Sequence, residues 1–99
     1  MASPVPASLP MLELDIMKTF VAIAETGNFT TAADAVFRTP SAVSMQIKKL
    51  EDMLRVSLFR RDARSVTLTH HGEILLSYAK RMIALNNEAV WVHPTTSAN

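Results

Sequence analysis

Two helices joined by a tight turn are predicted for residues 28–54, which read NFTTAADAVFRTPSAVSMQIKKLEDML. Asn28 and Thr39 are residue types that cap the amino termini of helices, and Pro40 suits the first position of a helix because it needs no N–H partner there. Residues 37–39 have the three-residue length of the turn in a helix-turn-helix, which sets its helices at a steep angle. The predicted elements are a helix over residues 29–36, this turn, and a helix over residues 40–54.

The second of these helices has two distinct faces. At about 100° per residue, its apolar side chains share one narrow arc, and the opposite side carries polar residues and one methionine. The apolar arc holds Val43, Ile47, Leu50 and Leu54, and the opposite side holds Ser41, Met45, Lys48 and Asp52. We expect the first set to pack in the core and the second to face outward.

A helix and a pair of short strands flank this segment. Apolar residues recur at helical spacing over residues 14–25, and Gly27 suits a carboxyl-terminal cap. Residues 58–61 and 66–68 read as two very short strands joined by a charged turn, which is the pattern of a wing. The predicted fold is mainly α: a winged helix-turn-helix with a three-helix core, a two-stranded wing and a long C-terminal dimerisation helix.

That last helix is capped by Thr69 and carries a broad apolar face, wider than one small domain needs to cover. Part of this face is therefore expected to meet a second copy of the chain, giving a homodimer. The residues predicted to form the dimer contact are Leu75, Tyr78, Met82, Leu85 and Ala89.

The length and composition fit one small domain. Cysteine is absent, which excludes disulfides and cysteine nucleophiles. No apolar run is long enough to span a membrane, and the amino terminus lacks the basic region of a signal peptide, so a cytoplasmic location is expected. The predicted divisions are a disordered segment at 1–11, the winged helix-turn-helix at 12–68, the dimerisation helix at 69–90 and a frayed tail at 91–99.

Charge is distributed unevenly along the chain. Residues 12–34 hold one basic residue against four acidic ones, whereas residues 38–64 hold seven against three. A concentrated basic segment is typical of a phosphate-binding surface, although a solvated structural face has the same composition. Charge alone leaves these two interpretations equal.

The outward face of the second helix favours DNA. Small hydrogen-bonding residues at the start of a capped helix, preceded by a short helix and a turn, match the geometry that enters a major groove. Ser41, Ser44, Met45 and Lys48 are expected nearest the bases, where serine hydroxyls can bond base edges and methionine can pack on a thymine methyl. Thr39 suits a phosphate. Arg61 and Arg64 of the wing are expected at the DNA backbone or in a narrow minor groove.

A specific set of motifs points to a known family. They are Phe20-Val21-Ala22-Ile23-Ala24-Glu25, Gly27-Asn28-Phe29-Thr30, Ala32-Ala33, Ser41-Ala42-Val43-Ser44, Gln46-Ile47, Leu50-Glu51, Leu58-Phe59-Arg60-Arg61, and Leu68-Thr69 before Gly72. By these motifs, residues 12 to about 90 resemble the amino-terminal DNA-binding domain of the LysR-type transcriptional regulators of bacteria. Within that family the chain looks closest to the subgroup that controls motility, exoenzymes and virulence.

The resemblance implies a homodimer joined by antiparallel fourth helices, each protomer reading half of an inverted repeat in a promoter. It places Thr30, Thr39, Pro40, Ser41, Ser44, Met45, Lys48, Arg61 and Arg64 at the DNA. Members normally carry a ligand-sensing domain after the fourth helix, so the chain is expected to be a fragment whose effector would bind elsewhere. Base preference is expected to differ from other members, because the family's usual proline falls at Ser41 and Met45 replaces a residue that is often Arg or Gln.

Other functions have weaker support. The chain has no Ser-His-Asp spacing, phosphate-binding glycine loop or paired carboxylates, so we expect no catalysis and no cofactor. His70 and His71 point about 100° apart on a helix, so no metal site is expected. A winged helix that binds protein, and a purely structural dimerisation domain, remain the two alternatives.

Overall fold

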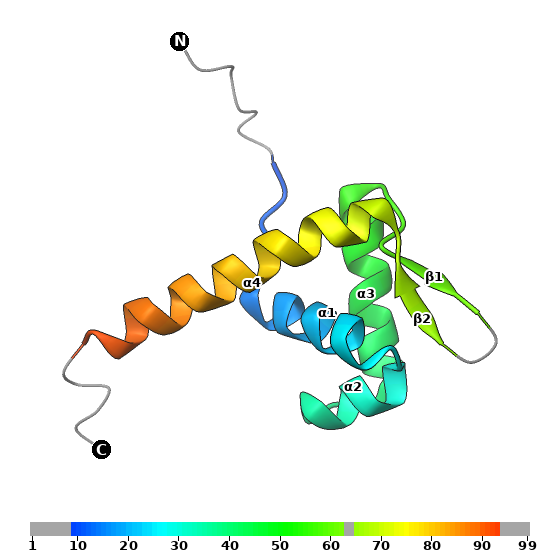
Figure 1. The fold of residues 1–99 in the computed structure, drawn as a ribbon, viewed down its shortest axis with the longest axis horizontal. Helices are drawn as coiled ribbons and strands as arrows, with labels where there is room; N and C mark the ends of the chain where they lie inside the picture. The colour runs from blue at the N-terminus through cyan, green and yellow to red at the C-terminus, as the bar shows by residue number, and fades with distance from the viewer. Residues whose placement is uncertain (1–8, 63–64, 94–99) are drawn as a thin grey trace, which may run out of the picture.

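Four helices and a two-stranded sheet make up the domain, as a computed structural model describes it for residues 9–62 and 65–93. The elements follow one another as α1 (Leu14–Thr26), α2 (Phe29–Ala35), α3 (Pro40–Leu54), β1 (Phe59–Arg61), β2 (Val66–Leu68) and α4 (His70–Trp91). Figure 1 shows α1, α2 and α3 grouped together, with the wing on one side and α4 running across them. The predicted winged helix-turn-helix is confirmed.

The helix boundaries follow from local hydrogen bonds. Gly27 ends α1 in the left-handed conformation, with φ 68°, and its N–H donates to the Ile23 carbonyl. The side chains of Asn28, Thr39 and Thr69 each accept a backbone N–H from the first turn of the helix that follows. These caps confirm the predicted helix starts.

Small residues let α2 cross closely over its neighbours. Ala32 and Ala33 are fully buried, in one cluster with Met17, Phe20 and Ile23 of α1. On α3, the predicted apolar arc supplies Val43, Ile47 and Leu50 to the same cluster, and Leu54 packs on its edge. The core therefore fixes α3 by its inner side and leaves its outer side uncovered.

The turn between α2 and α3 has an unusual backbone. Phe37 adopts φ 58°, a left-handed conformation that normally favours glycine or asparagine, and its side chain is 95% exposed. The sequence offers no glycine in this turn, so a phenylalanine takes the strained position.

The wing is an antiparallel pair in which Phe59 lies opposite Leu68 and Arg61 opposite Val66. Val66 N–H donates to the Gly27 carbonyl at 3.1 Å, which joins β2 to the junction between α1 and α2. The wing is therefore fastened to the junction between α1 and α2 at the end of the strand pair that holds Arg61 and Val66.

Helix α4 follows β2 directly and has two different halves. Its first half packs on α1 through Leu75 and Ala79, which belong to the core. Its second half extends beyond the other helices (Figure 1), and residues 84–93 are all exposed. The helix ends at Trp91, one residue beyond the predicted end, so the predicted tail begins inside it. Most of the predicted disordered segment at 1–11 and of the tail at 91–99 lies outside the described residues.

Candidate nucleic-acid interface

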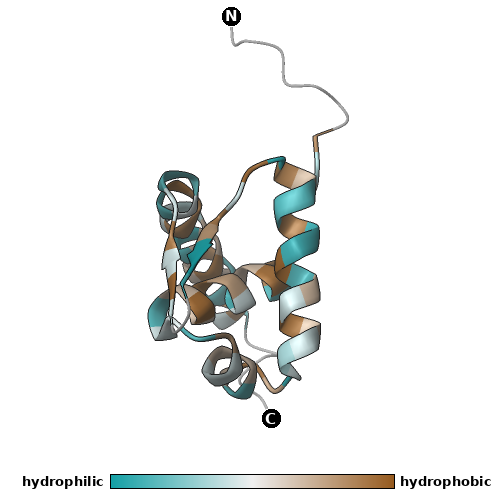
Figure 2. Ribbon diagram, turned by 90° about the vertical axis from the view of Figure 1, so that its right-hand side faces the viewer, coloured by the Kyte–Doolittle hydropathy of each residue, from teal (hydrophilic) through white to brown (hydrophobic). Residues whose placement is uncertain are grey.

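The outer face of α3 is open along its length. Ser41 is exposed, the side chain of Lys48 is 77% exposed and Met45 is 70% exposed, while Ser44 is half-buried beside them. Figure 2 shows α3 at one edge of the molecule, on the opposite side from α4. A face of this shape, with small polar groups and one cation, has the dimensions and chemistry to enter a major groove.

The start of α3 is rigidly set. Thr39 Oγ1 accepts the N–H of Ala42 at 3.1 Å and lies 3.5 Å from Ser41 Oγ, and Pro40 occupies the first helical position. A threonine hydroxyl that accepts one bond still has its own proton to donate. Thr39 can therefore cap the helix and bond a phosphate oxygen at the same time.

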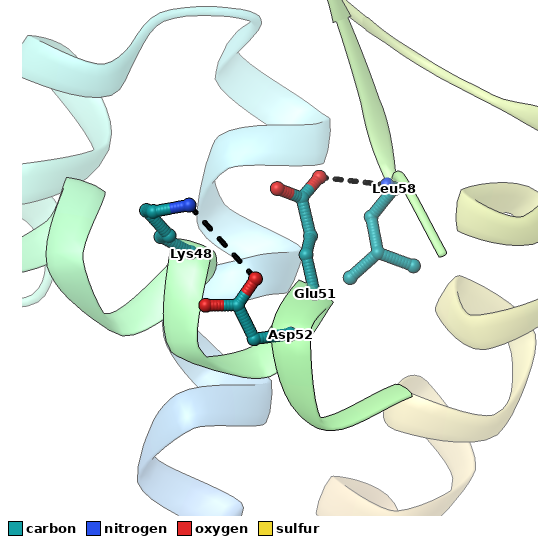
Figure 3. Close-up of polar contacts among 4 residues, drawn as sticks. All are labelled: Lys48, Glu51, Asp52 and Leu58. Atoms are coloured by element: carbon teal, nitrogen blue, oxygen red, sulfur yellow. Dashed lines mark hydrogen bonds and ion pairs between the residues drawn. The ribbon is translucent and has the colours of Figure 1, made fainter. Parts of the chain in front are cut away.

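Lys48 is partly engaged within its own helix. Its Nζ lies 3.9 Å from Asp52 Oδ1, one turn further along α3 (Figure 3). Both side chains are mostly in solvent, where such an (i, i+4) pair contributes only about 0.3–0.5 kcal/mol. Lys48 can leave Asp52 for a guanine or a phosphate at little cost.

Glu51 connects α3 to the wing. Its Oε2 accepts the backbone N–H of Leu58 at 2.7 Å (Figure 3), and Leu58 directly precedes β1. In the sequence, Glu51 stands out only as part of a family motif and as a negative charge. Its contact spans seven residues and crosses a turn, so no periodic pattern indicated it.

Arg61, the last residue of β1, contacts the start of α2. Its guanidinium carbon lies 4.5 Å from the centre of the Phe29 ring, so Arg61 reaches the first residue of α2. Thr30, the next residue, is exposed. Arg61 thus contacts Phe29, the residue directly before Thr30, and Phe29 is not among the residues predicted at the DNA.

The remaining predicted DNA residues divide into two groups. Within residues 9–62 and 65–93, no side-chain hydrogen bond or ion pair joins Arg61 or Thr30 to the outer face of α3. Arg64, predicted to contact DNA from the tip of the wing, lies outside the described residues.

The five residues predicted to form the dimer contact differ in how exposed they are. Leu75 is only 8% exposed and lies in the core of its own domain, so in this conformation it offers a partner almost no surface. Met82 is half-buried against the same core. Tyr78, Leu85 and Ala89 are exposed, together with Val90 and Trp91 at the end of α4. The free apolar surface therefore lies further along α4 than the periodicity indicated.

Metal-binding clusters and membrane-spanning helices are both absent from the described residues. Over residues 9–62 and 65–93, no three His, Asp or Glu side chains gather where they could hold a metal ion. In the same ranges, no helix combines the length and apolarity needed to cross a bilayer.

Comparison with known proteins gives a family match. Residues 14–73 match the model of the bacterial regulatory helix-turn-helix proteins of the lysR family. The transcriptional regulator PecT of Dickeya dadantii (strain 3937) is 46% identical over 78 residues, which are 79% of this chain and 25% of PecT. The transcriptional regulator DgdR of Burkholderia cepacia is 47% identical over 79 residues, 80% of this chain and 27% of DgdR. The chain thus spans about a quarter of the length of these relatives.

Solved structures match at the level of the fold. The DNA-binding domain of BenM, in complex with catB site 1 DNA, superposes with a TM-score of 0.81 at 30% identity, over 89% of this chain and 99% of that one. The DNA-binding domain of CbnR, also in complex with DNA, gives a TM-score of 0.75 at 32% identity, over 79% of this chain and 90% of that one.

Proposed function

The chain belongs to the lysR family of bacterial regulatory helix-turn-helix proteins, and we propose that it binds specific sequences in double-stranded DNA as a homodimer and thereby regulates transcription. The observation that carries the proposal is the outer face of α3, where Ser41, Met45 and Lys48 are uncovered while the inner face holds the core. The matched domains of BenM and CbnR were solved with DNA bound, which supports the same role for this fold here.

Each group of side chains has a separate part in this proposal. Ser41, Ser44 and Met45 contact base edges and discriminate between sequences, and Lys48 contacts a guanine or a phosphate. Thr30, Thr39, Pro40, Arg61 and Arg64 lie along the DNA backbone or minor groove. Backbone contacts supply affinity that depends on salt, because each one releases condensed counterions.

The homodimer forms through the exposed half of α4. Leu85 is 65% exposed on that half, and Tyr78 and Ala89 are exposed on the same stripe. An unpartnered apolar strip on a helix that leaves its own core is typical of a surface covered by a second copy. We place the protein in the cytoplasm and assign it binding without catalysis, as befits a family whose matched members are regulators.

Selection from random duplexes tests the DNA-binding proposal. The purified protein should enrich an inverted repeat with half-sites about one or two helical turns apart. Met45→Arg should then change the preferred base at one position of each half-site, because arginine adds two donors that suit guanine. Recovery of unrelated sequences, with binding insensitive to salt, would instead indicate a winged helix that binds protein.

Single-site variants test which face is used. Lys48→Ala should weaken binding to the selected duplex by about fivefold or more, measured by fluorescence anisotropy. Lys80→Ala is the matched control, because it removes the same charge from α4, where Lys80 pairs with Glu25 at 3.5 Å. Equal losses from both variants would contradict a groove contact at α3.

The oligomeric state is tested separately. Leu85→Glu should convert the dimer to a monomer in sedimentation, whereas Asn87→Glu adds the same charge about 160° away around α4 and should leave the dimer intact. A protein that dimerises but binds no duplex would match the structural dimerisation domain.

A further inference from the structure

A row of aromatic rings leads from the core to the wing. Phe20 of α1 is fully buried, and its ring centre lies 5.3 Å from that of Phe59 in β1. The ring of Phe29 meets Phe59 edge to face, with centres 6.1 Å apart. The Arg61 guanidinium then lies over the Phe29 ring. Three phenylalanines therefore connect Arg61, an exposed cation, to the buried core of the domain.

Backbone bonds hold the two ends of this row together. Arg61 and Phe59 belong to the same strand, while Phe29 follows the junction at Gly27. Because Val66, opposite Arg61, donates its N–H to the Gly27 carbonyl, strand and helix are fastened beside one another. The contact between Arg61 and Phe29 thus joins β1 and α2, whose relative position is already set by this backbone bond.

An aromatic ring positions an arginine without neutralising it. In the described ranges the two ion pairs are Lys48 with Asp52 and Lys80 with Glu25, and neither involves Arg61. A carboxylate in the place of Phe29 would take up the guanidinium's donors and cancel its charge. A ring instead covers the flat face of the guanidinium and leaves the N–H groups at its edge available.

We propose that Phe29 is a positioning residue for DNA binding: its ring holds the Arg61 guanidinium in the orientation that donates to a backbone phosphate. The proposal rests on the DNA-binding function given above. Without the ring, Arg61 has to give up the freedom of a long side chain when it meets the phosphate, and that ordering weakens binding.

A double-mutant cycle tests this role. Duplex affinity is measured for the wild type, Phe29→Leu, Arg61→Gln and the double variant, with Phe29→Tyr as the variant that keeps a ring. Phe29→Leu should raise Kd by roughly two- to tenfold for each protomer. In the Arg61→Gln background the same substitution should change Kd by less than about twofold. Phe29→Tyr should bind as the wild type does.

The salt dependence separates positioning from folding. Arg61→Gln should lower the slope of log K against log salt by about 0.9 for each protomer if Arg61 meets one phosphate. Phe29→Leu should weaken binding but leave this slope near the wild-type value, because its Arg61 still meets the phosphate, while thermal unfolding shows a folded domain. An equal loss of affinity in both backgrounds would assign Phe29 a merely structural role and overturn the proposal, as would unchanged affinity.

A measurement on the free protein keeps the inference distinct from the function. In NMR spectra, the ring current of Phe29 should shift the Arg61 Nε–H resonance, and the shift should vanish in Phe29→Leu and persist in Phe29→Tyr. Absence of that shift in the wild type would overturn the positioning role. If the shift is present but no duplex is bound, the DNA-binding function fails, and with it the proposal that rests on it.

Discussion

Replacing Gly72 by alanine should destabilise the domain, although alanine is the better helix former. Gly72 is buried in the first turn of α4, and a Cβ at this position would overlap the carbonyl oxygen of Leu58 and approach Leu68 Cδ2 to 2.9 Å. That carbonyl already accepts the N–H of Thr69 at 3.0 Å, while Thr69 Oγ1 donates to the Ser57 carbonyl at 2.6 Å. The start of α4 is therefore fastened to Ser57 and Leu58, directly before β1, with no room for a methyl group.

The size of the effect follows from three contributions. Helix propensity favours alanine by up to about 1 kcal/mol. Overpacking costs about 1–3 kcal/mol, at the upper end here because the obstructing atom belongs to the backbone. Displacing the bond between Thr69 and Leu58 adds about 1 kcal/mol. We expect a net loss of about 2–3 kcal/mol, which lowers Tm by roughly 10–20 °C in a domain of this size.

Urea and thermal unfolding, followed by far-ultraviolet circular dichroism, measure this loss. Gly27→Asn serves as the control: a Cβ at Gly27 has its nearest neighbour at 3.6 Å, an ordinary contact, and asparagine tolerates the φ of 68°. That variant should lose less than about 1 kcal/mol. A Gly72→Ala protein as stable as the wild type would refute the close approach of α4 to Leu58.

Three further substitutions test other features of the structure. Phe37→Asn should raise the free energy of unfolding by about 0.5–1 kcal/mol, because asparagine accepts the left-handed backbone better; a lower Tm would contradict the strain at Phe37. Glu51→Ala should lower the free energy of unfolding by about 1–3 kcal/mol, since the Leu58 N–H loses its acceptor. Asp52→Asn removes the partner of Lys48 and a negative charge beside the outer face of α3, so anisotropy titrations should show duplex affinity raised by about two- to fivefold. Unchanged or weaker binding would show that Asp52 does not compete for Lys48.

Local chemistry explains how far the sequence predicted the fold. Asn28, Thr39 and Thr69 cap helices through their own side chains, and Gly27 ends one through its own φ, so each boundary depends on neighbours within four residues. The two faces of α3 follow in the same way from helical periodicity.

Contacts between distant segments were beyond such reasoning. Periodicity puts Leu75 and Leu85 on one stripe of α4. Leu75 is nevertheless buried in the core, whereas Leu85 is exposed on the half of α4 that extends beyond α1. A helical wheel shows which side of a helix is apolar, but not where its neighbour ends. The contact of Glu51 with Leu58, and that of Phe29 with Arg61, likewise depend on how the wing is docked.

Because α4 leaves the core midway along its length, its exposed half sets the distance between the two domains of a dimer. If two protomers join through the far half, the separation and rotation of their α3 helices are set by the number of residues between Ala79 and the join. Each inserted residue lengthens the rod by about 1.5 Å and turns it by about 100°. A single insertion there would leave every protomer folded. The two α3 helices of the dimer would then no longer face the same side of the DNA double helix.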